Sequence, residues 1–267
     1  MDYHLHTYLC RHAGGTLPEY VEYARKRGLR EIGFADHFPL SVMDFVPQIQ
    51  VTMEPDELDT YLEMVSEVAS SAEGMTVKTG IELDYIPAKM QKASSILAQY
   101  PFDYVIGSVH FMDDWDLTHP YHIQGFEERC LEDVYERYFT MVQEACQSGC
   151  IDIIGHVDAV KKFNYCLSPE LLMTYYEEVA KVLSDTGVCL EVNTAGFDAP
   201  VKEMYPHQLL LEECVRRGVN IVMGSDAHAP EEVGRYFPYA TGVLREAGVT
   251  QLTHFERRKP YQVSLEG

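Results

Sequence analysis

The amino-acid sequence predicts an α/β barrel in which parallel strands alternate with helices. Short apolar runs alternate with longer amphipathic segments along the 267 residues. Seven strand–helix units in succession imply parallel strands joined by right-handed crossovers. A closed barrel fits the number of units and the chain length better than an open sheet, although periodicity alone does not separate the two. No linker, repeat or low-complexity tract divides the chain, so we expect one domain over residues 1–267.

The predicted strands are short apolar runs that end next to polar residues. They are Tyr3–His6, Glu31–Ala35, Thr76–Leu83, Tyr104–Val109, Ile151–Gly155, Val188–Asn193 and Asn220–Met223. Several of the helices predicted between them begin with proline near the first turn and end just before glycine. They are Pro18–Arg27, Pro55–Ala72, Ala88–Gln99, Glu127–Gln147, Pro169–Ser184, Pro206–Arg217 and Glu231–Glu246. The final residues Tyr261–Leu265 are either an eighth strand or a tail.

Composition excludes several classes of protein. The chain has 21 Lys and Arg residues against 42 Asp and Glu, a net charge of −21 that repels nucleic acid and anionic lipid. No apolar run approaches the ~18 residues of a membrane helix, and the first residues lack the features of a secretory signal. Seven cysteines without a CxxC pair are interpreted as reduced thiols. We therefore expect a globular cytoplasmic protein with no nucleic-acid or membrane partner, whose oligomeric state is not readable.

Histidines and carboxylates gather where the predicted strands end. In chain order these residues are His4 and His6 with His12 in the following loop, Asp36 and His37, Glu82 and Asp84, His110, His156 and Asp158, Glu191 and Asn193, and Asp226 and His228. In a parallel α/β fold these ends converge on one face, where active sites form. Imidazole and carboxylate ligands together suit Zn, Fe or Mn, so this face is the predicted metal site.

The spacing of the candidate ligands favours a cluster of metal ions. His4 and His6 lie two residues apart, so on a strand both side chains leave the same face. Asp226 and His228 repeat this spacing. The candidates exceed the needs of one four-coordinate ion, so we expect one carboxylate to be shared. Glu82 is the natural bridge because it stands alone between histidine-bearing strands.

Several of these segments resemble the PHP (polymerase and histidinol phosphatase) family. The matching motifs are His4–Thr7 with Cys10 and His12–Thr16, Gly33–His37, Gly80–Glu82, Gly107–Phe111, Gly155–Asp158 and Gly224–His228. They run in the family's order and span residues 4 to 228, which is most of the chain. The resemblance implies a distorted (β/α)7 TIM-like barrel with a trinuclear metal centre at the C-terminal ends of the strands.

The resemblance also implies which residues hold each of the three divalent ions. His4, His6, Glu82 and Asp226 would hold the first, Glu82, His110 and His156 the second, and His12, His37 and His228 the third. The ions would be Zn, Fe or Mn. A hydroxide bridging the metals would attack phosphorus, and the metals would stabilise the charge on the phosphoryl oxygens.

Within the family, three stretches look most like the stand-alone bacterial histidinol-phosphate phosphatases. They are Val109–Asp113, Val160–Phe163 and Leu190–Gly196. This implies hydrolysis of L-histidinol phosphate to L-histidinol and phosphate, a step of histidine biosynthesis. The family's Thr-Ala-Gly segment is usually followed by a basic residue, whereas Phe197-Asp198-Ala199 follows here, so another small phosphate ester or a nucleotide is the alternative substrate. A metal-storing or metal-sensing protein, or a partner-binding scaffold, is the non-enzymatic alternative.

Four further residues are candidates for contact with a phosphorylated metabolite. Lys161, Lys162 and Arg235 follow strand-end motifs on the active-site side, and their alternative interpretation is solvated surface charge. Asp36 adjoins His37 and is our candidate for the acid that protonates the departing alkoxide. That role needs a raised pKa at Asp36, which nearby cations oppose, so Asp36 is alternatively an orienting group or a ligand.

Overall fold

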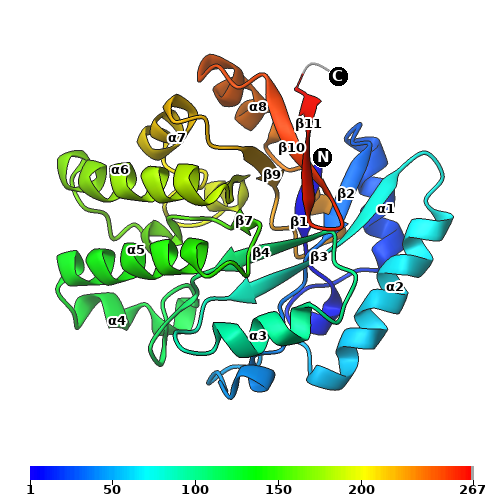
Figure 1. The fold of residues 1–267 in the computed structure, drawn as a ribbon, viewed down its shortest axis with the longest axis horizontal. Helices are drawn as coiled ribbons and strands as arrows, with labels where there is room; N and C mark the ends of the chain where they lie inside the picture. Colours follow the sequence, from blue (N-terminus) through cyan, green and yellow to red (C-terminus); the bar gives the residue numbers. More distant parts are fainter. Residues whose placement is uncertain (266–267) are drawn as a thin grey trace.

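The computed structural model describes residues 1–265, and a parallel sheet lies at its centre (Figure 1). Within this range the sheet has seven strands in the order β1-β2-β3-β4-β7-β8-β9. They are β1 (Asp2–Leu5), β2 (Glu31–Phe34), β3 (Thr76–Asp84), β4 (Tyr104–Ser108), β7 (Ile153–Ile154), β8 (Cys189–Asn193) and β9 (Ile221–Gly224). Every neighbouring pair runs parallel, which confirms the predicted α/β class.

The two edges of this sheet meet and close it into a barrel. Leu5 at the end of β1 forms a parallel bridge with Ala227, just beyond β9. The His6 N–H donates to the Ala227 carbonyl at 3.0 Å, and the Ala227 N–H donates to the His4 carbonyl at 3.1 Å. The TIM-like barrel expected from the sequence is therefore confirmed.

Helices surround the strands on the outside of the barrel (Figure 1). They are α1 (Leu17–Lys26), α2 (Leu58–Ser71), α3 (Met90–Leu97), α4 (Gln124–Glu127), α5 (Leu131–Gln147), α6 (Pro169–Thr186), α7 (Gln208–Arg216) and α8 (Phe237–Glu246). Local signals set their ends. The α1 helix starts at a capping box of Thr16 and Glu19, and α6 ends at Gly187, whose φ of 76° suits glycine. No helix within residues 1–265 is long and apolar enough to cross a membrane.

Most predicted elements differ from the observed ones by a few residues at their ends, and three differences are described here. The predicted helix Glu127–Gln147 is divided between α4 and α5. The predicted helix Glu231–Glu246 begins only at Phe237, because Tyr236 has a φ of 58° and interrupts the helical path after a short 3-10 turn at Pro230–Glu232. The strand predicted at Ile151–Gly155 is reduced to the two residues of β7.

Two antiparallel hairpins supplement the barrel. One joins β5 (Phe111–Met112) to β6 (Trp115–Asp116), and the other joins β10 (Gln251–Glu256) to β11 (Lys259–Ser264). The suggestion that Tyr261–Leu265 adds an eighth barrel strand is wrong, because β11 pairs with β10 in a separate sheet.

The end of the barrel where the strands begin is filled by Tyr104. Its ring stacks on Tyr3 with centroids 4.6 Å apart, and its hydroxyl donates to the Tyr3 carbonyl at 2.6 Å. A Cβ at Gly33 would lie 2.1 Å from the Tyr104 hydroxyl oxygen, and one at Gly80 would lie 2.4 Å from the ring. Only glycine leaves room for the ring on these strands. The Tyr104 ring fills that room and closes this end of the barrel.

Candidate metal centre

The predicted ligands come together at the opposite end of the barrel, where the strands finish. His4 lies in β1 and Glu82 in β3, whereas the other ligands follow the ends of strands or lie in the next loop. Those others are His6, His12, His37, His110, His156, Asp226 and His228. All but His12 are buried or half-buried, so the topology brings side chains in or just beyond six strands into one shielded cluster.

Glu82 is the centre of this cluster. Near its Oε2 lie Nδ1 of His37 at 3.0 Å, Nε2 of His4 at 3.4 Å and Nε2 of His6 at 3.6 Å. Near its Oε1 lie Nε2 of His156 at 3.1 Å and Nε2 of His110 at 3.5 Å. Its two oxygens therefore face two different groups of imidazoles, which is the arrangement that a shared carboxylate requires.

Several buried polar atoms of the cluster have no hydrogen-bond partner within residues 1–265. They are His4 Nε2, His6 Nδ1 and Nε2, His37 Nδ1, Glu82 Oε2, His156 Nδ1 and His228 Nε2. Burying a polar atom unpaired costs about 1 to 3 kcal/mol, so such a group of atoms points to a missing partner. Nε2 of His110 and Nε2 of His156 lie 3.3 Å apart. Two nitrogens that each lie about 2.1 Å from a tetrahedral ion are about 3.4 Å apart, so the donor set fits divalent metal ions.

A second layer of oxygens sets the tautomers of the histidines. Nδ1 of His4 lies 2.6 Å from Glu191 Oε1, and Nδ1 of His110 lies 2.8 Å from Asp84 Oδ1. A ring whose Nδ1–H donates to an oxygen presents the lone pair of Nε2 to a metal. Both carboxylates follow the same strand-end pattern as the ligands, but the pattern does not say which carboxylates stand behind the imidazoles. Their orienting role was therefore missed.

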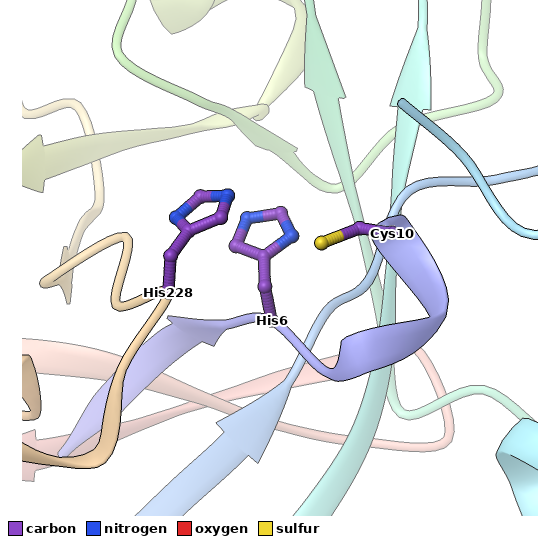
Figure 2. Close-up of side chains that lie close together, drawn as sticks. All are labelled: His6, Cys10 and His228. Atoms are coloured by element: carbon purple, nitrogen blue, oxygen red, sulfur yellow. The ribbon is translucent and has the colours of Figure 1, made fainter. Parts of the chain in front are cut away.

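His6 lies between His228 and Cys10 (Figure 2). The His6 and His228 rings stack with centroids 4.1 Å apart, while the Cys10 thiol points toward the His6 ring from the other side. Nδ1 of His6 lies 3.6 Å from Asp36 Oδ1. Asp36 is fully buried and is not among the residues that line the cavity above the cluster.

The Asp36 carboxylate is already held by hydrogen bonds. It accepts from the His37 N–H at 2.7 Å and from the Thr7 N–H at 3.1 Å, and the Thr7 hydroxyl donates to it as well. This geometry places Asp36 behind His6 and His37, on the side away from the cavity.

Glu82 and His228 have the charge that metal binding requires, whereas His110 must release a proton when a metal ion binds. Burial raises the pKa of Glu82, but the surrounding imidazoles, His37 first, outweigh it and hold the pKa well below its usual range. Burial disfavours protonated His110, yet the carboxylates of Asp84 and Glu82 raise its pKa to about 9. For His228, burial and the neighbouring imidazoles lower the pKa well below its usual value. An ionised Glu82 and a neutral His228 are the forms that bind metals.

A cavity of about 380 Å³ opens above the cluster, and Lys162 and Asp116 lie in its wall. Lys162 has no ion-pair partner in the described part of the chain, and burial lowers its pKa. Asp116 accepts hydrogen bonds from the Thr118 N–H and hydroxyl, both at 3.0 Å, which leaves its second oxygen for a ligand. Arg11 also lines the cavity, but its guanidinium pairs with Glu57, so within residues 1–265 Lys162 is the unpaired cation and Asp116 the orientated carboxylate beside the cluster.

The other two predicted substrate contacts lie elsewhere. Lys161 is buried, and its ammonium group contacts Asp158 at 3.0 Å and Glu203 at 3.2 Å and donates to the Met204 carbonyl at 3.0 Å. Neither Lys161 nor Arg235 lines the cavity. Both cations are engaged by the protein, so this arrangement does not support a substrate contact at either residue.

Comparison with known proteins agrees with the fold and the site. Residues 2–195 match the family model of the PHP domain. A probable histidinol-phosphatase of Deinococcus radiodurans is 37% identical over 259 residues, which cover 97% of each chain. The histidinol-phosphatase of Bacillus subtilis is 30% identical over 255 residues, covering 87% of this chain and 95% of that protein.

A solved structure shares the whole fold. It is the histidinol phosphate phosphatase of Lactococcus lactis, crystallised with zinc, L-histidinol and phosphate. The TM-score is 0.84 at 22% sequence identity, with 97% of this chain and 98% of that chain covered. Because the family model spans most of the chain and close relatives match it from end to end, this protein belongs to the PHP family.

Proposed function

We propose that this protein is a metal-dependent phosphomonoesterase that hydrolyses L-histidinol phosphate to L-histidinol and phosphate. The observation that carries the proposal is the position of Glu82, whose two oxygens face separate groups of histidines. A single metal ion would need only one of these groups. The two curated relatives named as histidinol-phosphatases support the choice of substrate.

Three divalent ions, Zn, Fe or Mn, would be held by the three ligand sets. The ligand atoms of His4, His6 and Asp226 lie within 4.8 Å of one another, and so do those of His12, His37 and His228. Glu82, His110 and His156 form the remaining set. When bound, such ions lower the pKa of water and stabilise negative charge on phosphoryl oxygens.

Residues in the cavity wall would bind the two charged parts of the substrate. The Lys162 ammonium group would contact the phosphate, since it has no carboxylate partner of its own within residues 1–265. Asp116 would accept a hydrogen bond from the ammonium group of the histidinol part. Asp36 would orient His6 and would not protonate the leaving group, because its carboxylate is held by Thr7 and His37 away from the cavity.

The alternatives have less structural support. Asp198, the reason for considering another phosphate ester, does not line the cavity. A protein that only stores or senses metal needs no space for a substrate, whereas this cluster lies below a cavity of about 380 Å³.

Steady-state kinetics tests the proposal. kcat/KM for L-histidinol phosphate should exceed that for nucleoside monophosphates and sugar phosphates by orders of magnitude. Asp116→Asn should raise KM for L-histidinol phosphate but not for 4-nitrophenyl phosphate, which has no ammonium group. Asp114→Asn, an exposed carboxylate of the same hairpin, is the matched control. A preference for another ester would overturn the assignment of L-histidinol phosphate as substrate. Absence of phosphate release with Zn, Fe and Mn would overturn the assignment of phosphatase activity.

A further inference from the structure

Arg235 uses its whole guanidinium group within the protein. Nε and Nη2 donate to the Ser225 carbonyl at 3.2 and 3.1 Å, and Nη2 also donates to the Asp226 carbonyl at 3.2 Å. Nη1 contacts Asp198 Oδ2 at 3.1 Å and Glu232 Oε1 at 3.0 Å. Four of these contacts are hydrogen bonds and the fifth, to Glu232, is an ion pair, so all three nitrogens of the guanidinium are engaged. Within residues 1–265, each nitrogen of the Arg235 guanidinium therefore already has a partner in the protein.

These contacts hold the loop that follows β9 and carries two predicted metal ligands. Asp226 has a φ of 52°, in the left-handed region that is uncommon for residues other than glycine, although aspartate adopts it more readily than most. Arg235 binds the carbonyls of Ser225 and Asp226, while Glu232 Oε2 accepts from the His228 N–H at 2.8 Å. The Arg235–Glu232 ion pair therefore holds the loop at Ser225 and Asp226 on one side and at His228 on the other.

We propose that Arg235 and Glu232 are positioning residues that clamp the Ser225–His228 loop, so that Asp226 and His228 are arranged for metal binding before the ions arrive. The inference rests on the proposed metal-dependent function, but it concerns the affinity for metal and not the choice of substrate. Without the clamp, binding must also order the loop, and that entropic cost weakens the affinity.

Asp198 supports the clamp from the outside. Its Oδ2 pairs with Arg235, and its Oδ1 accepts from the Tyr236 hydroxyl at 2.7 Å. A basic residue at this position would repel the Arg235 guanidinium, whereas the Asp198 carboxylate attracts it. The Asp198 side chain is 48% exposed, and solvent screens the pair. Its removal should therefore weaken metal binding less than removal of Arg235.

Zinc affinity of purified full-length variants tests the clamp. Competition with a chromophoric chelator should show zinc binding about 10- to 100-fold weaker in Arg235→Met than in the wild type. Arg235→Lys keeps the charge but not the planar fork, so it should recover only part of the loss. Arg245→Met, at an exposed arginine of α8, should bind zinc like the wild type. At saturating zinc, kcat of Arg235→Met should recover while KM stays within about twofold of the wild type.

Two results would overturn the clamp. Unchanged zinc affinity in Arg235→Met with a KM raised tenfold would make Arg235 a substrate contact. A lower free energy of unfolding of the metal-free variant with unchanged zinc affinity would make its role merely structural. If Arg235→Met does not fold, Glu232→Ala replaces it, and zinc binding several-fold weaker is expected. A wild type that binds zinc but releases no phosphate would refute the proposed function, while zinc affinity would still decide the clamp.

Discussion

Buried polar groups are hydrogen-bonded at one end of the barrel, whereas several lack a partner among residues 1–265 at the other end. At the end where the strands begin, the Tyr104 hydroxyl donates to a backbone carbonyl, and its ring packs against the bare backbone of Gly33 and Gly80. At the end where the strands finish, fully buried imidazoles such as those of His4 and His6 keep ring nitrogens that have no hydrogen-bond partner among residues 1–265. The closed end contributes stability, whereas the open end carries unsatisfied groups that a bound metal ion would satisfy.

The same comparison explains how one strand serves both ends. Strand β3 contributes Gly80 to the packing around Tyr104 and, two residues later, Glu82 to the metal centre. Alternate residues of a strand point to the same face, so both positions face the barrel interior. A change at either position should therefore affect one end of the barrel and spare the other.

The largest effect is expected at Glu82. Glu82→Ala removes a ligand from two of the three proposed ions, whereas His12→Ala removes a ligand from one. Metal analysis should show fewer ions per chain in Glu82→Ala. Its kcat/KM should fall by at least about 10³-fold, more than the 10- to 100-fold typical of a residue behind the ligands. Full metal content with unimpaired activity in Glu82→Ala would refute the shared carboxylate.

Without metal ions, the free energy of unfolding should depend on pH because His110 in the metal centre can then titrate. In the metal-free protein the pKa of His110 is about 9, above the value of about 6.5 in an unfolded chain. The folded state then binds this proton more tightly. The tighter binding of this proton adds at most about 3 kcal/mol to the free energy of unfolding. This stabilisation is complete below about pH 6.5 and is lost as the pH rises through 9.

Urea unfolding of chelator-treated protein measures this dependence. The free energy of unfolding should decline between about pH 6.5 and pH 9, and the slope should be shallower in His110→Gln. An identical slope in the variant would show that His110 does not carry the effect.

A change at the closed end should affect stability alone. The Cβ of Gly80→Ala would collide with the Tyr104 ring, so overpacking should lower the free energy of unfolding by about 1 to 3 kcal/mol. Metal content and kcat of the folded protein should stay at wild-type values. Gly242→Ala is the matched control, since a Cβ there meets no atom within 4 Å. Loss of metal in Gly80→Ala would mean that the two ends are coupled.

A smaller effect is expected for the carboxylates behind the ligands. Asp84→Asn and Asp36→Asn should each weaken zinc binding about 10- to 100-fold by leaving His110 or His6 less well oriented. Asp36→Asn should lose activity equally on an alkyl phosphate and on a nitrophenyl ester. A loss confined to the alkyl phosphate would instead identify Asp36 as the acid that protonates the leaving group.

The positions of the metal-centre residues were predictable because strand ends are visible in the sequence and parallel topology brings them together. The positions of His110 and His156, for example, could be predicted from the strand that precedes each of them. The fold class followed from the same alternation of elements. The β10–β11 hairpin was not assigned, because antiparallel pairing at the end of the chain depends on contacts that local patterns do not contain.

The direction of side chains in loops could not be predicted. Lys161 and Lys162 are neighbours in the sequence, yet Lys161 turns inward to Asp158 and Lys162 lines the cavity. Arg235 follows a ligand motif, but its guanidinium binds the loop that carries the motif. In each case, nearby carboxylates and carbonyls decide where a cation points, and these neighbours come from distant parts of the chain.

The central claim is that the open end of the barrel is a metal-dependent phosphatase centre. Metal content per chain and kcat/KM for L-histidinol phosphate, measured on the same samples through chelation and stepwise reconstitution with zinc, test it most directly. We predict that activity disappears on chelation and returns in proportion to zinc, reaching its plateau at three ions per chain. Full activity in metal-free protein, or a fully reconstituted protein that releases no phosphate, would contradict the account.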